Sequence, residues 1–461
     1  MHTVLNILRL SLLLGFGFSY FIGLGWLIID LLFHDDSTDK HKAFPLLQKI
    51  ALAIVLGVIV NYGIVLIFRS LSIGLFVGGI VAILGVWRLG SWYAKNRTVG
   101  ESLNKWLGVA LVCSLFLSSI LFEPLKDWDA RSIWFFHAKM IYAAGSIGLS
   151  AGWQLPLVAF SHVDYPNLVP SIAAQITYIL GYWNEYIPKI SLFFILVPIV
   201  MWLFSFARKS ISFVVLILII PFSIHLWIWN GYMDGYLAMY VAVAMLLLGR
   251  YIQRNDSIDL YSSLACLAFV LCLKNEGVLA LFAGVVSVAV AGFYMKKSRH
   301  ADIRQHIFSW RKIACAVIVL LPFVLWTFYK RSYGLSNDLK IGTAESIANI
   351  IERMKDGSAI LIFEQTYKYI EGSLLLFGLL YFVSIARNHA VPKMAVPALV
   401  TASIYYVGMF VVYLLTPYDL NWHLTFSANR TMLPVIECVF VASYYIFDSL
   451  ETLQKADQMM L

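Results

Sequence analysis

The sequence predicts an all-α polytopic membrane protein with about thirteen transmembrane helices and short extracytoplasmic interfacial helices. Hydrophobic residues make up 61% of the chain and charged residues only 13%, whereas soluble domains carry about 25% charged residues. The mean hydropathy is +0.79. Apolar residues collect in runs of roughly 20, the length at which a helix crosses a bilayer with its backbone hydrogen bonds closed internally.

The apolar runs follow one another along most of the chain. The first run, from Ile7 to Phe33, is longer than the roughly 7–15 apolar residues of a signal peptide, and it lacks a small-residue cleavage motif. We therefore interpret it as a retained span. The expected spans are residues 8–33, 45–68, 71–94, 105–123, 187–207, 211–229, 235–250, 258–273, 277–295, 313–329, 371–386, 394–415 and 431–448.

Lysine and arginine are concentrated in the short loops near residues 95–105, 208–209, 250–254, 296–312 and 387–393. Such loops are typical of the cytoplasmic side. The expected spans then place residues 124–186, 230–234, 330–370 and 416–430 on the extracytoplasmic side, where we expect them to share one face and one site. This distribution also explains the net charge of +8 without a nucleic-acid partner. The five cysteines include no CxxC pair and are expected to be reduced packing residues.

Two extracytoplasmic loops are long enough to contain helices of their own. In the first loop, we expect an interfacial helix over Arg131–Ala144 and a shorter helix over Pro166–Gly181. In the 330–370 loop, an amphipathic helix is predicted over Thr343–Gly357 on the membrane surface. Its apolar side chains recur with helical spacing at Ile347, Ile350, Ile351 and Met354.

Asp127 and Asp129 follow the fourth expected span in the sequence Lys-Asp-Trp-Asp-Ala-Arg. A carboxylate beside aromatic rings and partly removed from water has a raised pKa, which suits a general base for an attacking hydroxyl. Asp129 is also well placed to cap the helix that follows. A divalent cation is compatible with the pair but not required by it, so no cofactor is predicted with certainty.

The same loop continues with His162-Val-Asp164-Tyr165-Pro. The proline favours an extended approach and the first turn of the next helix. His162, Asp164 and Tyr165 are candidates for binding a sugar or assisting Asp129. A turn with incidental polar side chains is the alternative.

Three further candidates lie at or near the ends of later spans. Asp234 belongs to a turn of glycines and aromatic residues at 229–236, a composition that fits a saccharide platform as well as an ordinary interfacial turn. Lys274 and Glu276 interrupt an apolar stretch, and charged residues at membrane depth are functional by default. Lys274 is available to a lipid phosphate, with Glu276 holding it in place. A structural ion pair is the alternative.

The last candidates are His423 and Arg430. An arginine at the extracytoplasmic end of a span is unusual under the positive-inside rule, and its planar guanidinium can bind a phosphate with two parallel hydrogen bonds. His423 is a second donor. Snorkelling of Arg430 to the membrane surface is the alternative.

These motifs, in this order, resemble the GT-C superfamily of integral-membrane glycosyltransferases, in particular the bacterial branch related to protein mannosyltransferases and aminoarabinose transferases. An acidic residue after a span is followed by an aromatic helix with Ala-Lys, by His-x-x-Tyr-Pro and by Glu-x-x-Pro-Lys at 185–189. Later come Tyr-Met-Asp at 232–234, Lys-Asn-Glu-Gly at 274–277 and Asn-Arg-x-x-x-Pro at 429–434. The resemblance covers residues 105–450, and each motif is loose.

The resemblance implies transfer of a sugar from a polyprenyl-phosphate carrier to an extracytoplasmic glycan, lipid or protein acceptor, with inversion at the anomeric carbon. Asp129 would be the general base, with Asp127 as second choice. Lys274 and Arg430 would stabilise the departing lipid phosphate. The protein would lie among the lipids of a bacterial cytoplasmic membrane. Residues 1–104 would be additional transmembrane helices, 105–450 the catalytic module and 451–461 a cytoplasmic tail.

Two other functions fit a membrane protein of this kind. A transporter or flippase of a lipid-linked saccharide often has inverted repeats, and we find none in the sequence. A lipid-linked glycan polymerase or ligase usually concentrates arginines in one late loop, whereas the 330–370 loop carries Arg331 and Arg353 among mixed charges.

Overall fold

The structure is a computed structural model that describes residues 2–33, 45–95, 102–148, 152–208, 210–297, 309–335, 337, 339 and 343–460. It is 84% helical and contains no strand in this described part. Among the described residues, eleven helices are long and apolar enough to cross a membrane. The protein is therefore an all-α, multi-pass integral membrane protein, as the sequence predicts. Much of the expected basic loops near 96–101 and 298–308 lies outside the described residues.

Every expected span contains a helix, but two of these helices are short. They are α8 (Ile211–Ser223), with 13 residues, and α11 (Ser257–Val270), with 14 residues. At about 1.5 Å per residue each is roughly 20 Å long, against about 30 Å for the hydrocarbon core. α8 contains Pro221 two residues before it ends. By length, eleven helices rather than thirteen can span a membrane in the described part of the chain.

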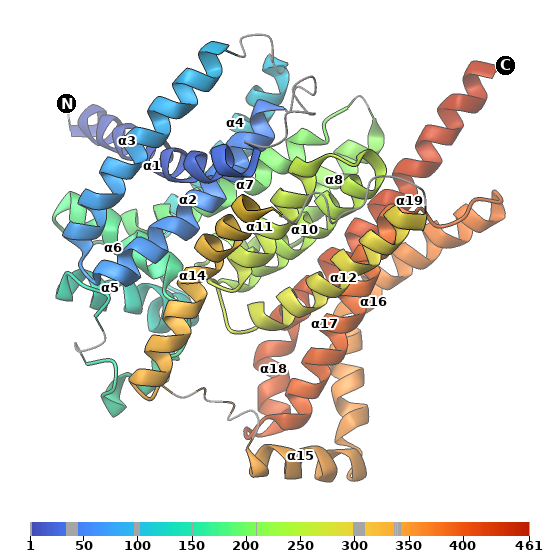
Figure 1. Cartoon of the computed structure of the whole chain (residues 1–461). Coiled ribbons are helices and arrows are strands. Elements are labelled where there is room, and N and C mark those ends of the chain that lie inside the picture. The colour runs from blue at the N-terminus through green and yellow to red at the C-terminus, as the bar shows by residue number, and fades with distance from the viewer. Residues whose placement is uncertain are drawn as a thin grey trace. The chain divides into compact units, whose positions relative to one another are not determined.

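The chain divides into two compact units. Figure 1 labels most of their helices. Unit 1 comprises Met1–Phe206, Ile228–Tyr232 and Arg304–Leu335, and unit 2 comprises Ala207–Trp227, Met233–Ile303 and Ser336–Leu461. The helices of unit 1 are α1 (His2–Phe33), α2 (Leu46–Phe68), α3 (Leu71–Lys95), α4 (Leu103–Phe122), α5 (Phe135–Ala144), α6 (Leu168–Leu180), α7 (Ile190–Ser205) and α14 (Trp310–Ser332). The predicted boundary at residue 104 separates additional helices from a catalytic module by function. A division by contacts does not test it, so it stays a prediction.

Unit 2 contains α8 and α11 together with seven further described helices. These are α10 (Asp234–Arg254), α12 (Gly277–Lys297), α15 (Ala344–Lys355), α16 (Ser358–Ala386), α17 (Val396–Leu415), α18 (Leu420–Thr431) and α19 (Leu433–Met460). The short helix α9 (Leu226–Trp229) contains the point where the chain passes from unit 2 to unit 1.

The central helix of unit 1 is α2. It packs against α1, α3, α6, α7 and α14, and most of its residues are buried. Glycines bring α1 and α2 into backbone contact: a Cβ atom on Gly57 would lie 1.8 Å from the carbonyl oxygen of Phe21. Small residues permit such close packing between membrane helices.

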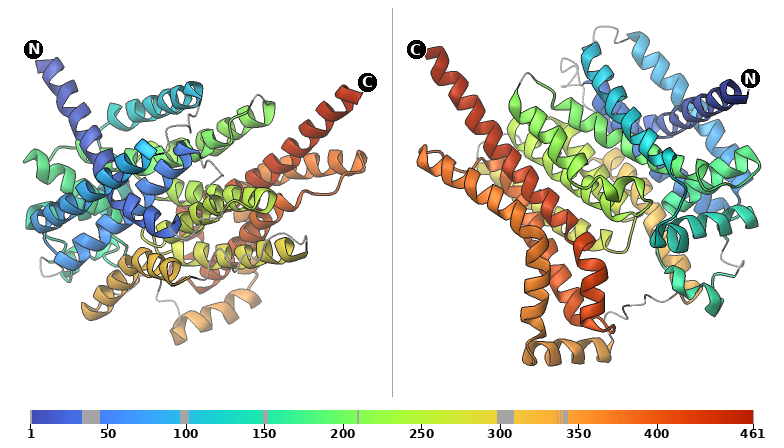
Figure 2. Two further views of the ribbon diagram at one scale, coloured as in Figure 1. Left: turned by 45° about the horizontal axis from the view of Figure 1, so that its top comes forward. Right: turned by 180° about the vertical axis from the view of Figure 1, so that it is seen from behind.

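The central helix of unit 2 is α10, which packs against α11, α12, α17 and α19. Its membrane-spanning segment is fully buried within the protein. Figure 2 shows α10 and α11, in yellow-green, side by side in both views. Arg250 joins them through a buried ion pair with Asp259 at 2.7 Å.

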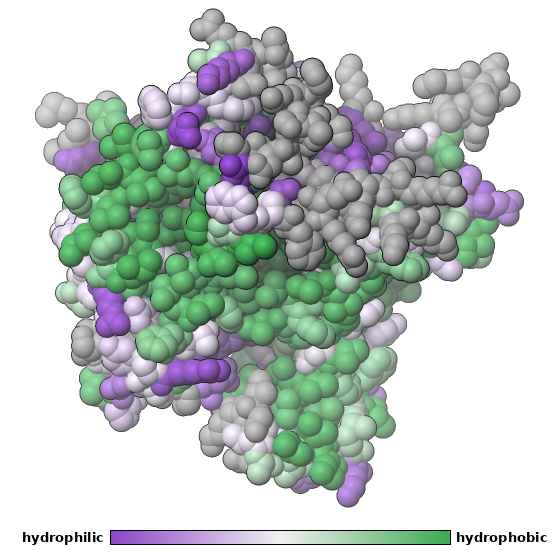
Figure 3. Space-filling view, viewed as in Figure 1, coloured by the Kyte–Doolittle hydropathy of each residue, from purple (hydrophilic) through white to green (hydrophobic). Residues whose placement is uncertain are grey.

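Other spans expose hydrophobic side chains. On α3 these include Phe76, Ile80 and Ile83, and on α14 they include Val317 and Phe328. Figure 3 shows hydrophobic side chains over both helices on the face in view. Apolar surface on a long apolar helix is suited to contact with lipid chains, so membrane lipids are partners of the protein.

The helices expected over Arg131–Ala144 and Pro166–Gly181 are present. A five-residue π-helix, Ala130–Trp134, leads directly into α5, which ends at Gly145 in the left-handed conformation with φ of 61°. The second helix, α6, has 13 residues and ends at Gly181 with φ of 80°. Glycine reaches this conformation without the steric cost that other residues meet.

The predicted amphipathic helix is α15. The Thr343 side chain accepts a hydrogen bond from the Ser346 N–H at 3.2 Å and caps its start. Ile347, Ile351 and Met354 form an exposed apolar stripe. The helix is confirmed, and its position on the membrane surface stays a prediction.

We predict that Gly57→Ala strongly destabilises the protein. The new methyl group would meet the backbone of α1, which cannot rotate away, so the loss should reach the upper end of overpacking effects, about 3 kcal/mol. The measurement is the thermal unfolding midpoint in detergent. Gly79→Ala is the matched control, because nothing lies within 4 Å of its Cβ position. Equal midpoints for the two variants would contradict the close contact.

Candidate functional site

The predicted site residues divide between the two units. Unit 1 contains Asp127, Asp129, His162, Asp164 and Tyr165, and unit 2 contains Asp234, Lys274, Glu276, His423 and Arg430.

Unit 2 contains a cluster of four charged side chains at the start of α10, which we call the charge cluster. Lys274 Nζ donates a hydrogen bond to Asp234 Oδ1 at 2.8 Å and lies 3.0 Å from Glu276 Oε1. Arg430 lies on the other side of the same carboxylate, with Nη1 3.8 Å from Asp234 Oδ2. Asp234 and Lys274 are buried, and Glu276 and Arg430 are largely so.

Two cations and two carboxylates make the charge cluster formally neutral. A single buried charge would be very unfavourable, so mutual pairing is what allows these groups to lie inside the protein. The contact from Arg430 to Asp234 is beyond hydrogen-bond distance, whereas Lys274 makes close contacts with two carboxylates. Lys274 is therefore the closer of the two cations to Asp234.

A tight turn between α11 and α12 positions Lys274 and Glu276. The N–H of Gly277 donates to the Lys274 carbonyl at 2.9 Å. A Cβ atom on Gly277 would lie 1.9 Å from the Val270 carbonyl oxygen. Glycine is thus required where the turn presses against the end of α11, and the turn carries both charged side chains to Asp234.

Arg430 is placed by α18, a short helix just before the last long helix. Asp419 caps its start by accepting a hydrogen bond from the Trp422 N–H at 2.8 Å. Tyr413 of α17 is within hydrogen-bond distance of Ser427 and Thr431, at 2.9 and 2.7 Å, and so ties the two helices together.

His423 packs among aromatic rings. Its ring centroid lies 5.1 Å from that of Tyr413 and 5.8 Å from that of Tyr418, both edge-on. This packing fixes the orientation of the imidazole at the start of α18. That His423 donates a hydrogen bond to a phosphate stays a prediction.

Arg353 is a residue whose role the sequence does not reveal. From α15 it donates to the backbone oxygens of Tyr413 at 2.8 Å, Leu414 at 3.2 Å and Tyr418 at 3.1 Å. A cation suits the first two carbonyls because they lie in the last turn of α17. Arg353 therefore fastens α15 to the turn before α18. In the sequence it is only one of several charges on an amphipathic helix.

In unit 1, Asp127 and Asp129 lie between α4 and the π-helix. Both are partly exposed, and Trp128 between them is largely exposed. Asp129 has a helical backbone conformation, and its side chain makes no capping hydrogen bond. The cap that the alternative interpretation expects is therefore not formed.

The His-x-x-Tyr-Pro motif forms an aromatic stack. The His162 ring lies 5.0 Å from Tyr165, and Tyr165 lies 5.4 Å from Trp134, with nearly parallel planes in both pairs. His162 reaches this arrangement with a left-handed backbone, φ 50°. Trp134 of the π-helix and two residues of the motif, Tyr165 and His162, thus form one continuous stack.

Asp164 faces away from solvent. Its side chain is buried with Oδ2 3.8 Å from Lys330 Nζ, and its backbone oxygen accepts a hydrogen bond from Trp326 Nε1 at 3.1 Å. Both partners belong to α14. Asp164 is accordingly placed to attach the loop to a span.

His137 occupies a buried polar pocket beneath the same loop. Its Nδ1 lies 2.9 Å from Asn167 Oδ1, and its Nε2 lies 3.2 Å from Ser161 Oγ. Burial lowers the pKa of His137 to about 4, and its hydrogen bonds offset this only in part. The imidazole is neutral at physiological pH, and its role is to connect the helix of the first loop to the segment before α6.

The Glu-x-x-Pro-Lys motif at 185–189 also closes this loop. Lys189 Nζ donates to the Glu123 carbonyl oxygen at 2.9 Å. Glu185 accepts a hydrogen bond from Lys139 at 2.7 Å. The charged residues of this motif thus tie the end of the loop to its beginning and to α5.

No group of three or more His, Cys, Asp or Glu side chains in the described residues is arranged to hold a metal ion. The five cysteines are buried free thiols. Comparisons of the chain with known protein families, with curated proteins and with solved structures find no match.

We predict that acidification destabilises unit 1 through His137. Between its ordinary pKa of about 6.5 and its folded value of about 4, the unfolded chain binds a proton that the folded chain does not. Stability therefore falls as the pH drops through this window, by at most about 3 kcal/mol. The measurement is the unfolding midpoint from pH 7.5 to 4.5. His137→Gln keeps a donor and an acceptor but does not titrate, so its midpoint should fall less. Parallel curves would refute the assignment.

Proposed function

We propose that the protein is a membrane glycosyltransferase that moves a sugar from a polyprenyl-phosphate carrier to an acceptor on the extracytoplasmic face, with inversion. The observation that carries this proposal is the charge cluster, in which Lys274 and Arg430 flank one buried carboxylate at the first turn of α10. The order of motifs that resembles the GT-C superfamily supports the same reaction.

The change in charge on the lipid phosphate during the reaction explains why such a cluster suits this chemistry. The acceptor oxygen bonds to the anomeric carbon while the bond from that carbon to the phosphate oxygen breaks, and its electron pair goes to the phosphate. A phosphodiester with one negative charge thereby becomes a monoester with up to two. Fixed cations stabilise the transition state because the negative charge increases during the reaction.

The acceptor hydroxyl must also lose a proton. Asp129 is our candidate base, because its carboxylate is partly exposed next to the start of the π-helix. Asp127 is the second candidate. The acceptor is a glycan, a lipid or a protein, and the sugar is a hexose or a pentose.

A transporter or flippase of a lipid-linked saccharide is the second candidate function. The observation in its favour is that the charge cluster is internally neutralised and lies at the ends of spans, as in many transport and relay sites. A transferase cleaves the donor, whereas a flippase moves it intact.

We predict that purified protein releases polyprenyl phosphate when given undecaprenyl-phosphate sugars and an acceptor glycan, and that Asp129→Asn lowers this rate by at least about 100-fold. The measurement is undecaprenyl phosphate by mass spectrometry. Asp127→Asn tests the second candidate in the same assay, and of the two variants the one that loses activity identifies the base. Full turnover by Asp129→Asn would remove the base assignment, and intact donor crossing the membrane of proteoliposomes would favour the flippase.

We also predict that Arg430→Ala lowers kcat/KM by about 10- to 150-fold, since a hydrogen bond to a charged group contributes about 1.5–3 kcal/mol. Arg430→Lys should recover part of this loss, because lysine keeps the charge but not the planar fork. Arg387→Ala, at an exposed position on the same unit, is the control. A loss below about threefold would exclude Arg430 as the phosphate clamp.

A further inference from the structure

Unit 2 contains a buried acidic side chain that the proposed transferase reaction does not use. Glu437 lies one turn into α19, within the apolar span Leu420–Gln454, and its exposed fraction is 0%. An ionisable group inside a span is costly unless it is paired, and by default it indicates a functional site. The partners of Glu437 therefore decide what it can do.

Glu437 belongs to a regular contact between α8 and α19. Ser223 Oγ lies 2.6 Å from Glu437 Oε1, and Ser212 Oγ donates a hydrogen bond to Asp448 Oδ1 at 2.7 Å. The two serines are eleven residues apart on α8 and the two acids are eleven apart on α19, about three helical turns in each case. The two serine–carboxyl contacts thus lie on the same face of each helix and can be compared directly.

The two acids differ in their other partners. Asp448 also pairs with the guanidinium of Arg208, so its negative charge is compensated. Among the described residues, no basic side chain pairs with Glu437, and the titratable group that interacts with it is the thiol of its neighbour Cys438. Helix α8 has no ionisable side chain. The basic residues on the other elements packed against α19 are Arg250, Arg254, Lys368, Lys393, His423 and Arg430.

Without a compensating cation, the neutral acid is the form of Glu437 that suits its position. An ionised carboxylate alone inside a protein is far more costly than a neutral polar group. The contacts of Ser223 agree, because its Oγ lies 2.6 Å from Glu437 Oε1 and 3.5 Å from the carbonyl oxygen of Ile220. A hydroxyl has one hydrogen and cannot donate fully to both. When Glu437 donates its proton to Ser223, the serine hydrogen is available to Ile220.

The second carboxyl oxygen leads to the same conclusion. Glu437 Oε2 is buried and has no hydrogen-bond partner in the part of the chain that the structure describes. In the carboxylate this oxygen would share the negative charge, whereas in the acid it is a neutral carbonyl oxygen. A neutral acceptor without a partner is less costly than a charged one.

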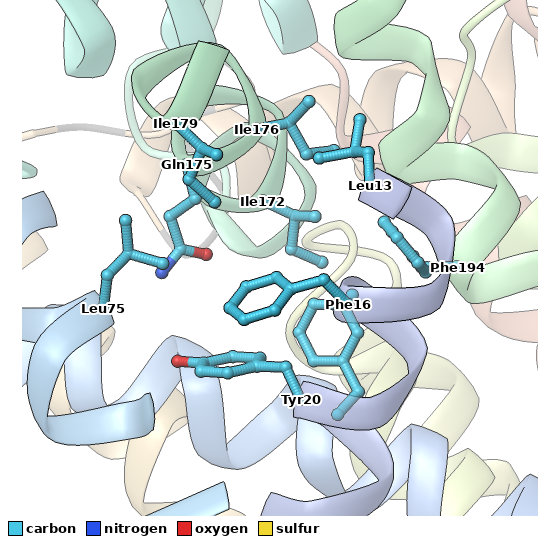
Figure 4. Close-up of a pocket in the computed structure, with 11 residues that line it drawn as sticks. Leu13, Phe16, Tyr20, Leu75, Ile172, Gln175, Ile176, Ile179 and Phe194 are labelled. Carbon is cyan, nitrogen blue, oxygen red and sulfur yellow. The ribbon is translucent and has the colours of Figure 1, made fainter. Parts of the chain in front are cut away.

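Buried polar side chains in unit 1 show a different arrangement. Beside a small hydrophobic hollow between α1, α3, α6 and α7, Tyr20 donates to Asn61 at 2.9 Å, and Asn61 and Gln175 exchange hydrogen bonds at 2.8 and 3.0 Å. Figure 4 shows the polar ends of Tyr20 and Gln175 on the same side of this hollow. Phenol and amide groups are neutral at physiological pH. Glu437 differs from them, because its carboxyl can take up and release a proton.

Ser223 connects this carboxyl to the outside of the protein. It is the last residue of α8 and is exposed, whereas Glu437 is buried. A proton can pass from Glu437 Oε1 to Ser223 Oγ while the serine's own proton passes to a water molecule, so one O–H bond forms for each that breaks. The reverse transfer restores the acid.

We propose that Glu437 is a proton-binding site within the membrane-spanning region, which holds its proton at neutral pH and exchanges it through the hydroxyl of Ser223. The ligand is a proton and not a metal ion. A hard metal cation takes about six oxygen ligands, and among the described side chains Ser223 supplies the one oxygen that contacts the carboxyl. The site does not depend on sugar transfer.

The test is infrared difference spectroscopy of the whole protein in nanodiscs. Subtracting the spectrum of Glu437→Gln should reveal the C=O stretch of one protonated carboxylic acid. Between pH 6 and pH 8 the protonated fraction of an ordinary glutamic acid falls about 100-fold, whereas this band should change less than about twofold. Asp448→Asn is the matched control, and it should remove a carboxylate band instead. If Glu437→Gln is not recovered folded, Glu437→Asp gives the same assignment, because the shorter acid shifts the band without removing it.

Variants of the serines test the exchange route. In heavy water the acid band shifts as deuterium replaces the proton, and Ser223→Ala should slow this shift at least about tenfold, as the loss of a hydrogen-bonded relay predicts. Ser223→Thr keeps a hydroxyl and should restore the rate. Ser212→Ala removes the corresponding serine opposite Asp448 and should leave the Glu437 band and its exchange unchanged.

Four results would overturn the proposal. Loss of a carboxylate band in Glu437→Gln would show that the group is ionised. A band that falls with pH as for an ordinary glutamic acid would show that the proton is not retained. Conversion of the acid band to a carboxylate band when sodium chloride replaces choline chloride would indicate a metal site. Unchanged exchange in Ser223→Ala would exclude the route through the serine.

Discussion

The structure depends on one constraint: a charged or polar group placed among apolar helices must find its partner within the protein. The charge cluster of unit 2 satisfies this constraint with two cations and two carboxylates around the start of α10. At the other end of the same helix, Arg250 and Asp259 satisfy it with a single buried pair. Such pairs contribute little net stability, yet removing one member is strongly unfavourable. They therefore fix which helices surround α10 more than they strengthen the packing.

Unit 1 meets the same constraint mainly with neutral groups, beside the buried Asp164, which lies 3.8 Å from Lys330. Asn61 pairs with Gln175, and His137 lies between Asn167 and Ser161. Neutral networks bring no net charge into the protein. Asn61 lies on α2, the helix whose Gly57 contacts the backbone of α1. The two units thus differ in chemistry: the interior networks of unit 1 are mostly neutral, whereas unit 2 holds a cluster of four charges around Asp234.

Much of the fold can be predicted from the sequence. The length of an apolar run indicates where a helix can span the membrane, and the helical spacing of apolar residues indicates where a helix is amphipathic. The long spans and α15 follow from these two signals. The shortness of α8 and α11 does not, since it depends on where the chain leaves each helix. The hydrogen-bond and ion-pair partners of buried polar residues are even harder to predict from the sequence. Lys274 pairs with Asp234, 40 positions away, and Asn61 with Gln175, 114 positions away, and no local pattern specifies either contact. Arg353 is similar, because its acceptors are backbone oxygens without a sequence signature.

The neutrality of the charge cluster bears on how it would act on a phosphate. A cluster with surplus positive charge would bind a polyprenyl phosphate product more tightly than the donor and would release it slowly. With Asp234 and Glu276 present, much of the attraction of Lys274 and Arg430 is already used within the protein. A donor with one negative charge competes weakly for these cations, whereas a leaving phosphate with nearly two competes better. The carboxylates would therefore concentrate the stabilisation in the transition state, which is where it accelerates the reaction, instead of in the bound donor.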